Sequence, residues 1–164
     1  MRRRRAADQF EFRPDALAPV IEWMDRLAGA HDGWINLLPG APEDAVEQPS
    51  GGAFSALFGV APAPVSMCTW IPARPRRSGD GEEAVGIMHS KGRAAAQLAT
   101  MGIGVPAGWR TGQDHPRRGL VVHPFPGTPH ADVLAWSLRA GAALAALPLS
   151  GSWRAQIHLP REQV

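Results

Sequence analysis

Glycine and proline recur along the whole chain and divide it into short segments. The 164 residues include 18 glycines and 16 prolines, the two residue types that interrupt helices and strands most strongly. A chain of this length fits one domain, which buries roughly 70% of the surface exposed in the unfolded state. We therefore expect one domain built from short helices and strands that are joined by many turns.

The second half of the chain shows the clearest alternation of elements. Strand-like patterns occur at residues 83–89, 107–113, 118–123 and 152–158. Apolar side chains at helical spacing follow Ser90 and Thr128, and both residues can cap the start of a helix. The expected order from residue 83 to residue 158 is therefore strand, helix, strand, strand, helix, strand.

This order is the βαββαβ unit of ferredoxin-like folds. In that unit the strands lie in the order 4-1-3-2 in an antiparallel sheet, with both helices on one face. We therefore expect an α+β fold with a ferredoxin-like core at about 83–158, in which strand 83–89 lies between strands 118–123 and 152–158.

The first half of the chain adds further elements to this core. An apolar stripe predicts a helix over residues 17–27, and strands are expected at 34–38 and 65–71. The segment 39–64 is interrupted by many prolines and glycines, and we expect it to pack as a flexible or lid-like segment. Taken as a whole, the order αβββαββαβ offers an alternative, because it resembles the layout of small secretion-chaperone-like dimers.

The positive charge of the chain is concentrated at its start. Residues 2–5 are all arginine, and without them the formal net charge of +2 would be −2. Proteins that bind nucleic acid specifically place Lys and Arg on one folded face, so we do not expect this activity. Residues 1–13 are expected to be a disordered basic tail and residues 14–164 a single domain.

Composition also bounds the compartment. No apolar run approaches the ~20 residues of a membrane span, and no apolar signal region follows the arginines. Cys68 is the only cysteine, which excludes an internal disulfide and a multi-cysteine metal site. Its strand-like surroundings predict a buried, unreactive thiol. All basic residues except Lys91 are arginine, which is typical of GC-rich bacterial genomes, and we expect a cytoplasmic protein.

One corner of the expected fold brings together basic residues and a helix start. The end of strand 83–89 should lie beside the turn between strands 107–113 and 118–123. Free N–H groups at a helix start and arginine side chains both favour phosphate or carboxylate groups. We therefore predict an anion-binding site formed by His89, Ser90, Lys91, Arg93, His115, Arg117 and Arg118. Alternatively, Ser90 only caps the helix, the arginines are solvated, and Asp114 holds the turn by a local hydrogen bond.

The opposite end of the sheet carries two histidines. In the expected order His123 and His158 end strands on either side of strand 83–89, which starts next to Glu82. Two histidines and a carboxylate can hold a metal or perform acid–base chemistry. Their spacing matches no local metal motif such as H-E-x-x-H, so His123 and His158 are a second candidate site only.

The remaining motifs name no reaction. No P-loop, dinucleotide fingerprint or G-x-S-x-G elbow occurs, so no cofactor is expected. Trp136 and Trp153 fall on apolar faces and are expected in the core. We expect a non-enzymatic binding or regulatory module for a small anionic ligand or a protein partner, with a homodimer as one arrangement. The alternative is a small enzyme that depends on a histidine or a metal.

Overall fold

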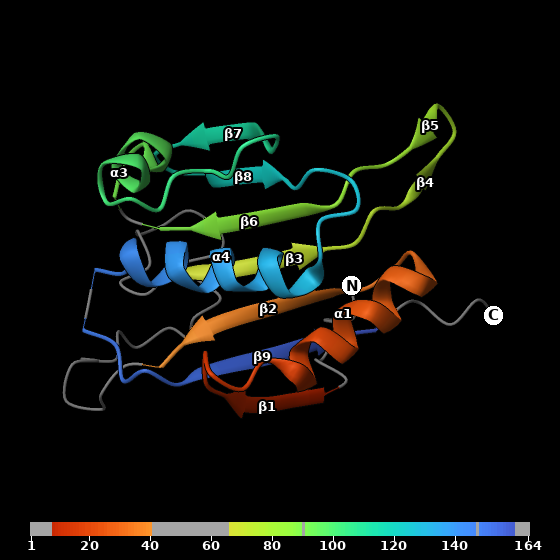
Figure 1. The fold of residues 1–164 in the computed structure, drawn as a ribbon, viewed down its shortest axis with the longest axis horizontal. Coiled ribbons are helices and arrows are strands. Elements are labelled where there is room, and N and C mark those ends of the chain that lie inside the picture. Colours follow the sequence, from red (N-terminus) through yellow and green to blue (C-terminus); the bar gives the residue numbers. More distant parts are fainter. Residues whose placement is uncertain (1–7, 41–65, 90, 147, 160–164) are drawn as a thin grey trace.

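A computed structural model describes residues 8–40, 66–89, 91–146 and 148–159. Within these residues seven strands form one antiparallel sheet, and three helices accompany it (Figure 1). The strands are β1 (Asp8–Phe12), β2 (Trp34–Pro39), β3 (Met67–Ile71), β6 (Ala84–Met88), β7 (Arg110–His115), β8 (Gly119–His123) and β9 (Trp153–His158). The helices are α1 (Ala18–Ala30), α3 (Ala94–Thr100) and α4 (His130–Ala143). The prediction of an α+β fold with a mostly antiparallel sheet is confirmed.

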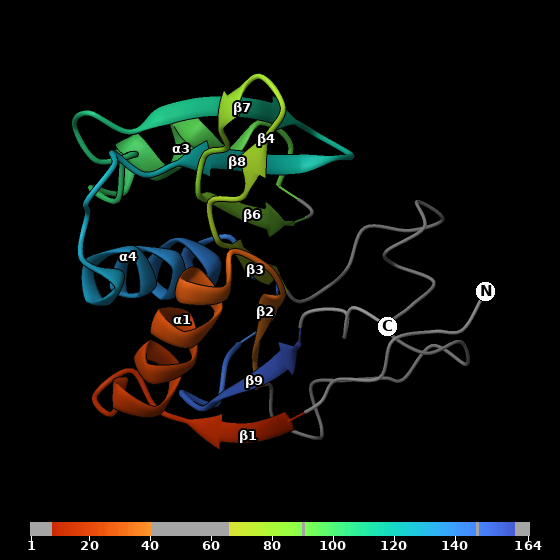
Figure 2. The same ribbon diagram turned by 90° about the vertical axis from the view of Figure 1, so that its right-hand side faces the viewer.

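One face of the sheet carries the core. Helices α1 and α4 lie side by side on this face, as Figure 2 shows. Alternate strand residues point under the helices and are at most 2% exposed: Ile35, Leu37, Cys68, Trp70, Val85, Ile87, Leu120, Val122, Ala155 and Ile157. The period of two follows from the pleat of a strand, which sends successive side chains to opposite faces. Trp136 and Trp153 are also buried in the core, as predicted.

Helix α4 approaches the sheet closely at Gly141. A Cβ atom built at this position would lie 2.7 Å from Cys68 Sγ and 3.1 Å from Trp153 Cη2. A glycine is therefore required for the helix to pack at this distance. The Cys68 side chain is fully covered, and burial raises the pKa of its thiol to about 12. The prediction of a buried, unreactive thiol agrees with this environment.

The strand order departs from the ferredoxin-like prediction. The sheet runs β1-β9-β2-β3-β6-β8-β7. Strands β6, β8 and β7 are neighbours in the expected order, but β9 pairs with β1 and β2 and not with β6. The predicted neighbourhood of strands 83–89 and 152–158 was therefore wrong, and the ferredoxin-like core is not confirmed. Strand β3 lies next to β6, with which it forms a hairpin, and β2 lies between β3 and β9.

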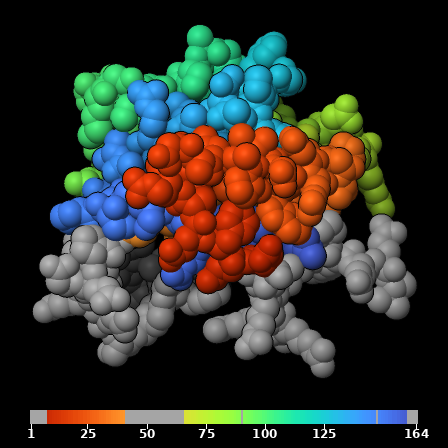
Figure 3. Space-filling model, turned by 60° about the horizontal axis from the view of Figure 1, so that its bottom comes forward, coloured from red at the N-terminus to blue at the C-terminus, as the bar shows by residue number. Residues whose placement is uncertain are grey.

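The N-terminal part of the chain closes one edge of the sheet. We predicted residues 8–12 within a disordered tail. They instead form β1, and every residue of β1 pairs with β9, so the prediction was wrong for them. Phe12 points into the core and is 6% exposed, which accounts for the ordering of this edge strand. In the space-filling view β1 and α1 form a continuous surface, red to orange (Figure 3). Residues 1–7 and the predicted segment between 41 and 64 lie outside the described residues.

A short hairpin extends beyond the sheet between β3 and β6. Its two strands, β4 (Pro75–Arg76) and β5 (Gly79–Asp80), project away from the rest of the chain in Figure 1. The hairpin base and the loop between β8 and α4 lie at the same end of the sheet, which is where the candidate site described below is found. Among the described residues, no helix combines the length and the apolar character needed to cross a bilayer.

Candidate functional site

The predicted anion-binding corner is only partly assembled. His89 is buried, with 5% of its surface exposed, and its Nδ1 accepts a hydrogen bond from the Lys91 N–H at 3.2 Å. Burial lowers the pKa of His89, and the nearby Asp114 carboxylate opposes this effect only in part. Ser90 lies outside the described residues. His89 is therefore a buried side chain that favours its neutral form, which is unsuited to attracting an anion.

Asp114 occupies the helix start that was expected to bind the anion. Its carboxylate accepts hydrogen bonds from the backbone N–H groups of Ala94, at 2.8 Å, and Ala95, at 3.2 Å. These are two of the otherwise unpaired donors in the first turn of α3. The prediction that Asp114 makes a local turn hydrogen bond was wrong, because this residue caps a helix 20 positions earlier in the chain. An external anion would have to compete with a carboxylate that the chain itself provides.

The turn between β7 and β8 does lie beside the end of β6, as expected. A Cβ atom at Gly119 would clash with the Ile87 carbonyl oxygen, so the turn contacts the end of β6 directly. His115 Nδ1 accepts hydrogen bonds from the N–H groups of Arg117 and Arg118, at 3.1 and 3.2 Å. His115 therefore organises its own turn, and the side chains of both arginines are exposed. Lys91 and Arg93 are exposed as well, so the anion-binding role of this corner stays a prediction.

The second predicted site is divided between distant parts of the sheet. Three strands separate β8, which ends at His123, from β9, which ends at His158. His158 stacks on Trp34, with 4.5 Å between ring centroids, while His123 lies near Glu82 and Glu83. No group of three metal-ligating side chains occurs among the described residues. The predicted joint site of His123 and His158 was therefore wrong, because β9 does not flank β6.

The structure instead shows a pocket at the end of the sheet where β3 leaves and β6 begins. Its volume is about 500 Å³, which is within the ordinary range for small-molecule sites. Its lining consists of His31, Ala73–Pro75, Asp80–Glu83, Pro124, Pro126 and Gly127. The lining therefore includes three acidic residues, Asp80, Glu82 and Glu83, and one arginine, Arg74. We call this feature the acidic pocket.

The charge of Arg74 is engaged by the fold. Its guanidinium lies 3.1 Å from the Asp32 carboxylate and donates a hydrogen bond to the Gly33 carbonyl at 2.9 Å. Arg74 therefore fastens the hairpin base to the end of α1, and its charge is offset locally by Asp32. The carboxylates of the acidic pocket gain little compensation from it.

Glu82 occupies the exposed rim of the pocket. A hydrogen bond from Arg110 lowers the pKa of Glu82, and the charges of Arg110, His123 and Arg76 act in the same direction. His123 Nδ1 lies 3.7 Å from Glu82 Oε2 and donates to the Glu83 carbonyl oxygen at 3.0 Å. Glu82 is therefore ionised at neutral pH, but basic neighbours balance its charge.

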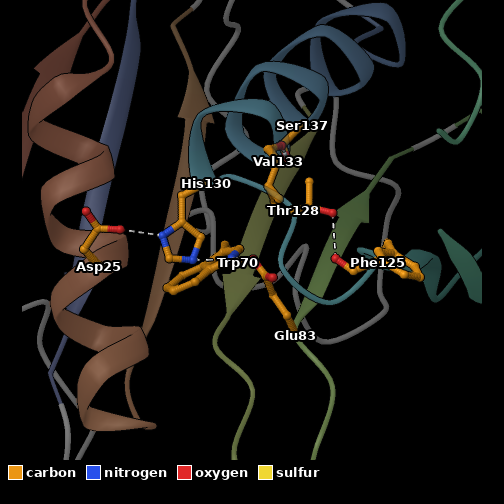
Figure 4. A network of polar contacts seen from close by, with 8 residues as sticks. All are labelled: Asp25, Trp70, Glu83, Phe125, Thr128, His130, Val133 and Ser137. Carbon is orange, nitrogen blue, oxygen red and sulfur yellow. Dashed lines mark hydrogen bonds and ion pairs between the residues drawn. The ribbon is translucent and has the colours of Figure 1, made fainter. Parts of the chain in front are cut away.

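Glu83 is the more enclosed carboxylate, with 17% of its side chain exposed. The indole N–H of the buried Trp70 donates a hydrogen bond to Glu83 Oε1 at 2.6 Å. The same oxygen lies 4.0 Å from His130 Nε2, at the start of α4. His130 Nδ1 in turn donates to Asp25 Oδ1 on α1 at 2.7 Å (Figure 4). The His130 ring thus lies between two carboxylates, edge-to-face with Trp70 at 5.4 Å.

Sequence reasoning missed this arrangement. It placed Glu83 at a strand start, His130 at a helix start and Asp25 within the N-terminal helix, but nothing in their spacing joined them. The three residues are separated by 47 to 105 positions, and only the packing of α1 against α4 brings them together. The usable signal was the polar Glu83 directly before an apolar strand.

Comparison with known proteins identifies no family to which this chain belongs. The chain matches no protein-family model, no curated protein and no solved structure.

Proposed function

We propose that this protein is a ligand-binding module that holds a small organic cation, an amine or a guanidinium compound, in the acidic pocket. The observation that carries the proposal is Glu83, a residue that lines a pocket of about 500 Å³ and whose side chain is only 17% exposed. A carboxylate in such surroundings favours a cationic partner, because partial burial strengthens the attraction and weakens screening by salt.

The surroundings of Glu83 support the same ligand class. The Trp70 indole N–H donates a hydrogen bond to one carboxylate oxygen of Glu83, which restricts the side chain before a ligand arrives. Preorganisation of this kind reduces the entropy lost on binding. Asp80 is a second acidic residue of the lining, and Pro124 and Pro126 provide apolar walls for the carbon chain of a ligand. The mixture of a few polar groups with apolar walls is typical of small-molecule pockets.

Calorimetric titration with agmatine, which carries both an amine and a guanidinium group, tests the proposal. A charged hydrogen bond contributes about 1.5–3 kcal/mol, so Glu83→Gln should weaken agmatine binding by at least about tenfold. Glu22→Gln is the matched control, because Glu22 is an exposed carboxylate on α1 away from the pocket lining, and this variant should bind as the parent does. Equal affinities of Glu83→Gln and the parent would refute the proposal.

The same titration distinguishes a cationic ligand of the acidic pocket from the anionic ligand that the sequence predicted. Inorganic phosphate and glutarate serve as anionic probes, with Arg117→Ala and Arg118→Ala as the variants. The proposal predicts no phosphate binding that depends on these two arginines. Phosphate binding that is lost in both variants, without agmatine binding, would favour the corner around α3 instead.

An acid–base enzyme is the second candidate, and the hydrogen bond between Asp25 and His130 favours it. A carboxylate that orients an imidazole is a common arrangement for proton transfer. The hydroxyls drawn in Figure 4 do not serve as nucleophiles for this histidine, since Thr128 donates to the Phe125 carbonyl and Ser137 to the Val133 carbonyl. His130 would have to act on a bound substrate directly. Hydrolysis of p-nitrophenyl esters faster than buffer, abolished by His130→Gln, would support this candidate.

A further inference from the structure

The residue that follows β6, His89, has a ring whose contacts fit only its neutral form. His89 Nδ1 accepts a hydrogen bond from the Lys91 N–H at 3.2 Å, so the hydrogen of the neutral imidazole lies on Nε2. That Nε2 atom is buried and has no hydrogen-bond partner among the described residues. One ring nitrogen is therefore occupied as an acceptor, and the other is a donor without an acceptor.

Protonation of His89 would turn both ring nitrogens into donors. The Nδ1 hydrogen would then face the Lys91 N–H, and the Nε2 hydrogen would still lack an acceptor within the described part of the chain. Burial opposes the charged ring as well, because it lowers the pKa of His89, and the Asp114 carboxylate counters this effect only in part. A protonated ring therefore has to leave the position that the neutral ring occupies.

His89 is connected to the start of α3 at two points. The Gln97 side chain, which belongs to α3, donates hydrogen bonds to the carbonyl oxygens of Lys91 and Arg93, so the backbone held by His89 is tied to the helix. Asp114, whose charge attracts a protonated His89, caps the first turn of the same helix. Movement of the His89 ring therefore affects both contacts that fix this helix start.

We propose that His89 is a pH-sensitive switch for the start of α3. The neutral ring holds the Lys91 amide and leaves the Asp114 carboxylate to cap the helix. The protonated ring releases the Lys91 amide and attracts the Asp114 carboxylate, so the helix start loses both constraints and opens. The switch is independent of the acidic pocket and of its ligand.

The other charged groups around His89 leave Asp114 as its counterpart. Strand β3, which pairs with β6, and helix α3 contain no charged residue. His115 accepts two N–H groups of its own turn, while His123 and His130 lie at the opposite end of the sheet, where β6 begins. The remaining charged residues of the neighbouring segments are exposed to solvent: Lys91, Arg93, Arg117, Arg118, Asp132 and Arg139.

Amide hydrogen exchange of the full chain, followed by NMR at about pH 7.5 and about pH 5.5 and corrected for intrinsic rates, tests the proposal. Carboxyl groups ordinarily titrate below this range. At about pH 5.5 an accessible histidine, with an ordinary pKa of about 6.5, is protonated about ten times as often as it is neutral. Protection of the Lys91, Ala94 and Ala95 amides should therefore fall by about tenfold on acidification. Low concentrations of urea should not change this loss, because the opening is local.

Three variants identify the groups responsible. His89→Gln should abolish the pH dependence, because glutamine stays uncharged across the range. His123→Gln is the matched control and should keep it, since this histidine lies at the other end of β6. Asp114→Asn lacks the charge that attracts the ring, so its helix start should be less protected at about pH 7.5 and change less on acidification.

The opposing results are equally specific. Protection that changes by less than about twofold in the parent overturns the proposal. A loss that is as large in His89→Gln, or one that extends to the strand amides and grows with urea, also overturns it, because another group or global unfolding would then be the cause. If His89→Gln does not fold, the nitrogen NMR shifts of the His89 ring in the parent decide the matter. The ring must then titrate at the same midpoint as the loss of protection, and titration without that loss refutes the switch.

Discussion

Removal of the Asp114 carboxylate should destabilise the chain by a predictable amount. In Asp114→Ala, the N–H groups of Ala94 and Ala95 lose their acceptor, now at 2.8 and 3.2 Å. The side chain of Arg93, the N-cap residue of this helix, makes no capping hydrogen bond. Both amides would then depend on water at a helix start whose first residue, Ala94, is fully buried.

The magnitude follows from the two hydrogen bonds. Loss of a helix cap costs about 0.5–2 kcal/mol, and hydrogen bonds to charged groups lie at about 1.5–3 kcal/mol each. Because the site is half-buried and water can replace part of the loss, we expect about 2 kcal/mol for Asp114→Ala. For a chain of this size that loss lowers Tm by roughly 4–8 °C. Asp114→Asn keeps one oxygen acceptor without the charge and should lose about half as much.

Urea denaturation of the parent and both variants, followed by far-ultraviolet circular dichroism, measures these differences. Asp132→Ala is a suitable control, because Asp132 is an exposed carboxylate in the first turn of α4 and should cost no more than about 1 kcal/mol. A loss in Asp114→Ala no larger than that of the control would show that Asp114 does not cap α3. The helix start would then be open, and the anion-binding corner would regain its main support.

Three further predictions follow from buried groups. Burial raises the pKa of the Cys68 thiol to about 12, so a thiol reagent at about pH 8 should modify it only on unfolding; rapid modification of the folded chain would contradict this. Burial lowers the pKa of His89, so the unfolded chain takes up its proton first as the pH falls. The free energy of unfolding should therefore decrease as the pH falls through about 6.5, and less so in His89→Gln; equal pH profiles in urea denaturation would be the opposing result. Gly141→Ala should cost about 1–3 kcal/mol by overpacking against Cys68, and a double-mutant cycle with Cys68→Ala should show coupling of at least about 0.5 kcal/mol; additive losses would rule out the contact.

Much of the fold was predictable because each strand buries one of its two faces under the helices. Alternation of apolar and polar residues located β2, β3, β6, β8 and β9 to within a few residues, since each strand buries one face only. The pairing of β7 with β8 followed from their short connection, and the pairing of β6 with β8 followed from the expected strand order. The place of β9 was not predictable in this way, because it joins the sheet after a long helix and pairs with β1, a strand hidden in a polar N-terminal sequence.

The candidate site was less predictable than the fold. The turn that carries His115, Arg117 and Arg118 does lie beside the end of β6, which His89 follows, as the expected topology required. Their chemistry differed from the expectation, because the Asp114 carboxylate reaches the helix start that an anion would need. Asp114 and Ala94 are 20 positions apart in the sequence, and this spacing gave no sign of their contact.

By itself, the amino-acid sequence determined the class of the fold, the apolar faces and the burial of Cys68, because these depend on local periodicity and composition. The tertiary structure alone decided that Asp25, Glu83 and His130 meet beside the acidic pocket. Each of these side chains lies on a different element, and their approach depends on how α1 and α4 pack across the sheet. Polar contacts between distant elements carry no repeat that a sequence can display, so this cluster of side chains could be recognised only from the packing.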